Sequence, residues 1–285
     1  MKLAHIIVAT DLSESMEPAY EWLRLFSEIS IAKPRITLIH FPQIPEPAGN
    51  FIHAGNYAEG FLNEYFNRAQ LALENVVKRE DFKGMDVKGE LIILGDNDFG
   101  AGIAGFSQKN PADLVILVAK HRNTGLLTGS RLSQMLKAIK SPVFICGKKP
   151  IAFHGRIAFA TDFSRPSTLV YRQLTEMFAH TKTTISPFFV NTPAELISQN
   201  AFREKSLEFS KSAGLKGTGM IKLTNAWSVE EGICNFSEDT LADIIAVSWQ
   251  DGKSNVPGVF RNSLTEFLLR ESALPIIVLP APREK

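Results

Sequence analysis

The stretch HIIVATDLS, residues 5–13, returns later in the chain as RIAFATDFS, residues 156–164. Each copy is a short apolar run that ends in the shared core A-T-D-x-S. A repeat of this kind indicates that one structural unit has been duplicated, and it says more about the fold than any single motif does. The repeat therefore decides how the rest of the chain is divided.

Two further matches follow in the same order. The segments GIAGFS (102–107) and ADLVILV (112–118) match GICNFS (232–237) and ADIIAVS (242–248), and SPVFIC (141–146) matches LPIIVL (274–279). Three matches in one order predict two domains, residues 1–149 and residues 150–285. A chain of 285 residues fits this division, since a domain commonly holds roughly 150 residues.

Within each copy, short apolar runs alternate with stretches that are apolar at helical spacing, such as AYEWLRLF at 19–26. The runs are nearly continuous in apolar residues, which is typical of strands covered on both faces. This alternation predicts an α/β fold with two tandem doubly wound parallel sheets of five strands each. The expected strands are residues 5–11, 35–41, 87–94, 112–119 and 142–147 in the first copy, and 156–162, 183–191, 217–224, 242–249 and 275–280 in the second.

The first copy is the longer one. Asp11 and Asp113 are 102 positions apart, whereas the matching Asp162 and Asp243 are 81 apart. The extra residues fall near 42–65, a stretch rich in Pro, Gly and aromatic residues that predicts a long loop leading into a helix. This insertion is either a lid over a ligand site, or a surface elaboration or a contact with the other half.

The composition argues against several classes of protein. The 31 basic and 30 acidic residues balance, so the chain has no field that would attract nucleic acid. No apolar run approaches the roughly 18 residues of a membrane span, so we expect a cytoplasmic protein without membrane contact. The two cysteines, Cys146 and Cys234, form no C-x-x-C, so we expect no metal site and place both in the core.

In doubly wound sheets, ligands bind beyond the carboxyl ends of the strands, where the strand order reverses. Asp11 and Asp162 end the first strands of their copies and are therefore candidate ligand contacts. The alternative is structural, since Ser13 and Ser164 follow them at positions suited to capping the next helix. His40 ends the second strand, where it is either a general base at the same crevice or a structural residue.

The order of these features resembles the universal stress proteins, and the resemblance covers both copies. It rests on a first strand that ends in Asp, an ADLVIL-type fourth strand, a Gly/Ser loop, a helix and a closing strand. The spacing agrees, since Ser130 precedes Pro142 by 12 positions and Ser263 precedes Pro275 by 12. The resemblance implies the strand order 3-2-1-4-5 and a pairing of the domains through their last strands, as a pseudo-dimer within one chain. The resemblance is also compatible with a homodimer of two such chains.

Members of this family that bind ATP carry G-x2-G-x9-G-[ST] after the fourth strand, and neither copy keeps this pattern intact. The first loop is too short, and the second has bulky Trp249 in place of a glycine that allows close backbone approach. For ATP or AMP, the resemblance implies contacts from Asp11, Gly129 and Ser130 in the first copy, and from Asp162, Gly252 and Ser263 in the second. Arg122 and Arg131 are candidate anion contacts in place of the missing glycines. The other interpretation is that both loops have degenerated.

Catalysis finds little support in the sequence, which contains no G-x-x-x-x-G-K-[ST], G-x-S-x-G or H-E-x-x-H. We therefore expect no catalytic residues, and a non-enzymatic stress-response or regulatory protein that binds a protein partner or a small ligand. An ATP- or AMP-binding switch in the first copy is the alternative. An oxidoreductase would depend on GAGIAG at 100–105, which we interpret as a helix start with small packing residues, because only its middle glycine recurs in the second copy.

Overall fold

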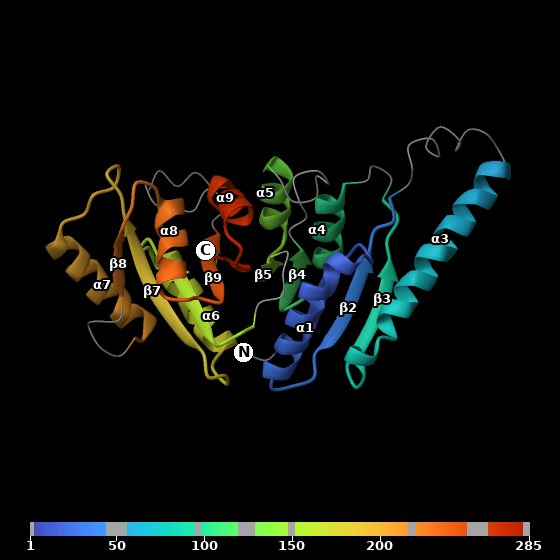
Figure 1. Cartoon of the computed structure of the whole chain (residues 1–285), viewed down its shortest axis with the longest axis horizontal. Coiled ribbons are helices and arrows are strands. Elements are labelled where there is room, and N and C mark those ends of the chain that lie inside the picture. Colours follow the sequence, from blue (N-terminus) through green and yellow to red (C-terminus); the bar gives the residue numbers. More distant parts are fainter. Residues whose placement is uncertain are drawn as a thin grey trace.

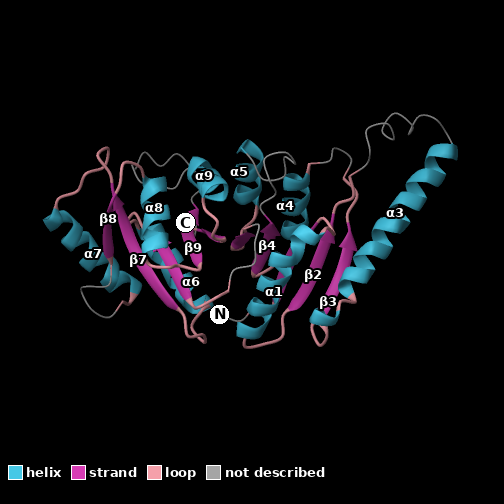
Figure 2. Cartoon of the chain, viewed as in Figure 1, coloured by secondary structure: helices cyan, strands magenta, loops and turns pink. Residues whose placement is uncertain are grey.

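The computed structural model describes residues 3–43, 56–94, 98–118, 129–147, 152–215, 221–249 and 262–281. In these ranges the strands form one sheet, with helices packed on both of its faces (Figure 1, Figure 2). The strands are β1 (His5–Thr10), β2 (Arg35–His40), β3 (Asp86–Leu91), β4 (Leu114–Val118), β5 (Val143–Cys146), β6 (Arg156–Ala160), β7 (Thr184–Asn191), β8 (Lys222–Asn225), β9 (Ile244–Trp249) and β10 (Ile276–Pro280). The helices are α1 (Glu17–Ile29), α3 (Asn56–Val77), α4 (Phe99–Lys109), α5 (Gly129–Ala138), α6 (Arg165–Met177), α7 (Gln199–Ala213), α8 (Val229–Asp239) and α9 (Asn262–Glu271).

The sheet has ten strands in the order β3-β2-β1-β4-β5-β10-β9-β6-β7-β8. Neighbours within each half pair in parallel, and each half has the predicted order 3-2-1-4-5. The last strands of the two halves, β5 and β10, pair antiparallel, with Ile145 opposite Ile276. The two five-stranded sheets expected from the sequence are therefore halves of one sheet, joined through their last strands as the resemblance implied.

The burial of the strands follows from their place in the sheet. The interior strands β4 and β9 are buried almost throughout, as their continuous apolar runs predict. The edge strand β3 alternates exposed and partly buried residues instead. The helices cover two hydrophobic clusters: one includes Phe26 of α1 and Leu174 of α6, and the other includes Ile103 of α4 and Leu268 of α9. Each cluster thus contains residues of both halves.

Aromatic rings join the two halves on the face covered by α1 and α6. The rings of Trp22 and Phe26 lie 4.8 and 5.0 Å from the ring of Phe144 in β5, measured between centroids. Trp22 also lies 5.6 Å from Phe153, and Phe26 lies 6.2 Å from Phe178. We call these residues the aromatic seam. Because Phe153 and Phe178 follow β5 in the chain, the seam packs the first half directly against the second.

Some boundaries differ from the sequence-based expectation. β3 ends at Leu91 rather than at 94, because its partner strand β2 ends opposite at His40. α3 begins at Asn56, inside the insertion, and extends past the end of the sheet in Figure 1. Residues 44–55 of the insertion, 217–220 of the expected eighth strand and the domain limit at 149 lie outside the described residues. The lid and the domain limits therefore stay predictions.

Candidate functional site

The A-T-D-x-S repeat forms the same turn at the carboxyl ends of β1 and β6, where the strand order reverses. Oγ1 of Thr10 accepts a hydrogen bond from the Leu12 N–H at 3.0 Å, and Oγ1 of Thr161 accepts one from Phe163 at 3.0 Å. Leu12 and Phe163 have φ angles of 61° and 62°, in the left-handed region that residues other than glycine rarely adopt. Such strain persists where the surroundings hold the backbone, and it concentrates at functional sites. The duplicated motif thus encodes a strained turn at each switch point.

The aspartates of the repeat organise these turns. Oδ1 of Asp11 accepts from the Ser13 N–H at 3.0 Å, and Oδ1 of Asp162 accepts from the Ser164 N–H at 2.9 Å. Oγ of Ser164 caps α6 by accepting from a backbone N–H of its first turn at 3.2 Å. Ser13 caps no helix, because its hydroxyl donates to Asp11 at 2.6 Å and the 3-10 helix Glu14–Met16 precedes α1. The predicted serine cap is confirmed in the second half and wrong in the first.

A buried tyrosine supports the turn of the first half. The hydroxyl of Tyr20 lies 2.9 Å from Oγ1 of Thr10. Burial raises the pKa of Tyr20 to about 12, against a smaller lowering by the hydrogen bond with Thr10, so the phenol stays neutral at neutral pH. The guanidinium of Arg79 lies 5.0 Å from the Tyr20 ring centroid and donates to Glu17 at 2.6 and 2.8 Å. Arg79 thereby ties the start of α1 to the segment after α3.

His40 contacts the same turn. Its Nδ1 lies 2.9 Å from the carbonyl oxygen of Thr10, which can only accept, so Nδ1 carries the proton. This contact favours the structural role of His40 over a general base acting through Nδ1. In the second half the matching strand position is occupied by Phe189. The two crevices therefore differ in chemistry although their turns are alike.

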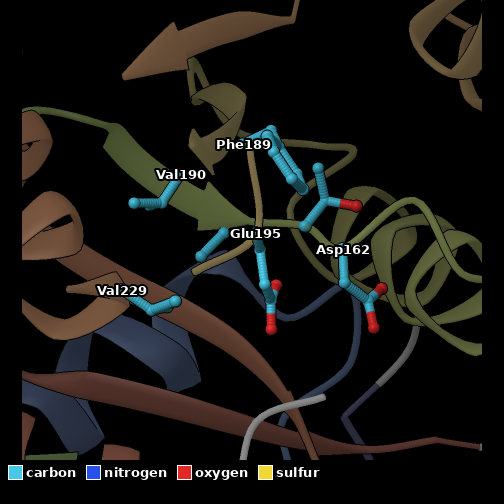
Figure 3. Close-up of a pocket in the computed structure, with 7 residues that line it drawn as sticks. Asp162, Phe189, Val190, Glu195 and Val229 are labelled. Atoms are coloured by element: carbon cyan, nitrogen blue, oxygen red, sulfur yellow. The ribbon is translucent and has the colours of Figure 1, made fainter. Parts of the chain in front are cut away.

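The second half contains a pocket at the end of β6 (Figure 3). The described residues enclose little space there, and the pocket is open to solvent. The carboxylates of Asp162 and Glu195 point to the same side in Figure 3. The full lining comes from the ends of β6 and β7, the turn after β7 and the start of α8: Ala160, Thr161, Asp162, Phe189, Val190, Glu195 and Val229.

The strained turn fixes the aromatic wall of this pocket. Phe163, the left-handed residue, stacks on Phe189 with ring centroids 5.0 Å apart and planes 17° from parallel. Phe163 also contacts Phe202 and Phe209 of α7 at 5.8 and 6.0 Å. These contacts hold the Phe163 ring between α7 and the pocket wall. The backbone strain at Phe163 is thus offset by aromatic packing.

A tight turn presents Glu195 to the pocket. The N–H of Glu195 donates to the carbonyl oxygen of Thr192 at 3.0 Å, with Pro193 at the second position, which its fixed φ favours. Oδ1 of Asn191 accepts from the Ile197 N–H at 2.9 Å, just beyond the turn. The turn is therefore held at both ends by bonds that do not involve the Glu195 carboxylate. Neither Glu195 nor Phe189 was predicted as a site residue. The segment TPAE at 192–195 indicates a turn, but it does not indicate that this turn lies beside the end of β6.

Trp249 occupies the position of the first loop glycine in the second half. It is the last residue of β9, is 4% exposed, and belongs to the cluster under α8 and α9. Its carbonyl oxygen accepts from the Ala281 N–H at 2.7 Å, so the backbone at Trp249 still belongs to the sheet. A glycine at this place lets the backbone approach the phosphates closely, and the buried indole takes up that space. The place of the first glycine is therefore filled by core packing.

The remaining predicted contacts lie at helix starts or outside the described residues. α5 begins at Gly129 and α9 at Asn262, as expected for loops that open into helices. Two of the predicted contacts, Arg122 and Gly252, lie outside the described residues. Three more lie in the described helices, but their side chains are not described: Ser130, Arg131 and Ser263. Their contacts with Asp11, Asp162 or a nucleotide stay predictions.

The GAGIAG stretch starts α4, as interpreted from the sequence. Asp98 caps the helix by accepting a backbone N–H at 3.1 Å. A Cβ added to Gly102 would lie 2.8 Å from the side chain of Phe41, and a Cβ on the matching Gly232 would lie 2.4 Å from Val190. The glycine that recurs in both copies thus lets a helix approach the end of the neighbouring strand. This packing accounts for the motif without a dinucleotide.

The described residues contain no group of three or more His, Cys, Asp or Glu side chains that could hold a metal ion. Cys146 is buried, as expected, and its burial raises the pKa of the thiol. Cys234 is partly exposed, because α8 turns it away from the fully buried face. No helix in the described ranges is both long and apolar enough to cross a membrane.

The chain has the fold of the universal stress proteins. A universal stress protein from Archaeoglobus fulgidus DSM 4304 is similar at a TM-score of 0.70 and 16% identity, over 100% of this chain and 98% of that one. A proposed universal stress protein from Pseudomonas aeruginosa UCBPP-PA14 matches at 0.67 and 13%, over 98% and 94%. The cytoplasmic domain of a prokaryotic cation chloride cotransporter matches at 0.51 and 13%, over 98% and 95%. The tandem fold therefore occurs in proteins of different function.

No protein-family model matches the sequence, and neither does any curated protein.

Proposed function

We propose that the chain is a non-enzymatic universal stress protein that acts in a stress response or in regulation by binding a partner. The observation that carries this proposal is the crevice of the second half. There, the carboxylate of Glu195 adds a negative charge beside Asp162, which disfavours a triphosphate, and Trp249 fills the place of the first glycine. A crevice that keeps its strained turn, but whose loop sequence lacks the intact glycine pattern, is suited to holding a different ligand.

The polar groups of the repeated turns support binding over catalysis. Asp11 and Asp162 accept backbone hydrogen bonds that shape the turns. A general base needs a free lone pair within reach of the substrate proton, commonly with a second group that orients it. The described contacts of these residues instead stabilise local structure.

An ATP- or AMP-binding switch in the first half is the second candidate. Asp11 favours this candidate, because it lies at the switch point of the first half, in a turn like the one that contains Asp162 in the second half. α5 begins at Gly129, where backbone N–H groups are available to an anion. In this candidate, Arg122 and Arg131 take the place of the missing glycines in neutralising phosphate.

Isothermal calorimetry of the full chain with ATP and with AMP tests both candidates. The leading proposal expects no binding heat and no release of ADP from ATP. The switch expects heat that the change Asp11→Ala removes and that the matched change Asp162→Ala leaves intact. Heat that Asp162→Ala removes would show a nucleotide in the second half and would contradict both candidates, as would steady release of ADP.

A further inference from the structure

We propose that the pocket of the second half and its apolar rim are a docking surface for an arginine-bearing segment of a partner protein. The docking surface consists of Asp162, Phe189 and Glu195 in the pocket and of Leu196 and Trp227 beside it. The inference rests on the proposed function, since it names the chemistry of the partner that the same crevice would bind.

Two large exposed apolar side chains belong to the segments that line the pocket. Trp227 is 83% exposed and Leu196 is 76% exposed. Leu196 directly follows Glu195, and Trp227 lies two residues before Val229, which lines the pocket. Single exposed apolar residues are ordinary, but a pair beside a pocket is typical of an interaction site. Tryptophan is also among the residues most enriched in binding hot spots.

The loops that carry this rim are fixed to each other. Nδ2 of Asn191, at the end of β7, donates to Oδ1 of Asn225, at the end of β8, at 2.9 Å. The Ala226 N–H donates to the Asn191 carbonyl oxygen at 3.1 Å, one residue before Trp227. Oε2 of Glu231 accepts from the Trp227 N–H at 3.1 Å. The rim is therefore preorganised, which lowers the entropy lost when a partner binds.

The charge of the pocket specifies the partner's side chain. Within the described part of the chain, no Lys, Arg or His forms an ion pair with Asp162 or Glu195. The apolar lining from Phe189 and its neighbours strengthens the attraction of these carboxylates for a cation. A guanidinium offers five donors in a planar fork that can serve two carboxylates and can stack on an aromatic ring.

The apolar rim favours a peptide segment over a free amine. A small amine would neutralise Asp162 and Glu195 but would leave Trp227 and Leu196 in water. A segment with apolar residues beside its arginine covers both rim residues while the arginine enters the pocket. The pocket is small and open to solvent, so its mouth can receive the charged end of one side chain of a longer ligand.

The test uses the full chain and the peptide acetyl-Ala-Leu-Arg-Leu-Ala-amide, with citrulline in place of arginine as the neutral control. Of the three tryptophans, Trp22 and Trp249 are buried, so Trp227 reports binding by fluorescence. We expect the arginine peptide to bind and shift the emission to the blue, and the citrulline peptide to bind at least about tenfold more weakly. Glu195→Gln should weaken the arginine peptide by about tenfold. The control Glu208→Gln, on the exposed face of α7, should not change its affinity.

Three results would overturn the proposal: equal binding of the citrulline peptide, unchanged affinity in Glu195→Gln, or agmatine alone binding as tightly as the peptide. Trp227→Ala separates the rim from the pocket. Because this variant lacks the fluorescent reporter, its binding is measured by isothermal calorimetry; it should bind the peptide more weakly and agmatine with unchanged affinity. Failure here leaves the proposed function intact, because that proposal is tested by nucleotide binding and ADP release without any peptide.

Discussion

Replacing Asp243 by alanine is expected to lower the free energy of unfolding by about 3 kcal/mol. The side chain of Asp243 is 3% exposed, and its Oδ2 accepts from the N–H groups of His154 and Arg156 at 2.9 and 2.8 Å. Its Oδ1 lies 3.2 Å from Nδ1 of His154. Alanine would leave two backbone donors without their acceptor at the start of β6, and hydrogen bonds to a charged group contribute about 1.5–3 kcal/mol each.

Urea unfolding of the full chain, followed by circular dichroism, measures this loss. Asp113 accepts from the N–H groups of Ala4 and His5 at 2.6 and 3.0 Å in the first half, but it is less buried, so Asp113→Ala should cost less. The control Asp239→Ala, at the exposed end of α8, should stay within about 0.5 kcal/mol of the wild type. A loss below about 1 kcal/mol for Asp243→Ala would show that this carboxylate does not anchor β6.

Replacing Phe144 by alanine is expected to cost about 4 kcal/mol and to destabilise both halves together. Phe144 is fully buried in β5 and contacts Trp22 and Phe26 across the aromatic seam. It lies opposite Ile277 of β10, so the cavity left by alanine would open where the halves meet. Because both hydrophobic clusters contain residues of both halves, the loss is not confined to one of them.

The measurement for Phe144→Ala is a urea titration followed in parallel by far-ultraviolet circular dichroism and tryptophan fluorescence. We expect one transition with a lower midpoint by both probes, as a two-state unit requires. The matched control is Phe61→Ala on α3, where the ring is 54% exposed and the cost should be at most about 1 kcal/mol. Two separate transitions, with only the first one shifted, would show that the halves fold independently.

Much of the fold could be predicted because the same sequence pattern occurs in both halves of the chain. The A-T-D-x-S core predicted the end of β1 and of β6, and the apolar runs predicted strands buried on both faces. The strand order came from the resemblance, and the ten-stranded sheet follows from the β5–β10 pairing that the resemblance implied. The ends of β3 were less predictable, because a strand ends where its partner ends and not where its own apolar run stops.

The candidate site was predictable only in part. Asp11 and Asp162 could be placed because they follow strands in a local motif. Glu195 lies over β6 through a turn that follows a different strand, so its role depends on tertiary packing that no local pattern encodes. The two copies of the serine also differ, because Ser13 donates to Asp11 whereas Ser164 accepts from a helix N–H. The shared motif could not reveal this difference.

Native mass spectrometry of the full chain titrated with ATP tests the central claim most directly. If Trp249 closes the crevice of the second half to phosphates, we expect at most one nucleotide per chain, no conversion to ADP, and the same occupancy after Glu195→Gln. Two nucleotides per chain, or steady formation of ADP, would contradict a binding protein whose second crevice does not accept nucleotides.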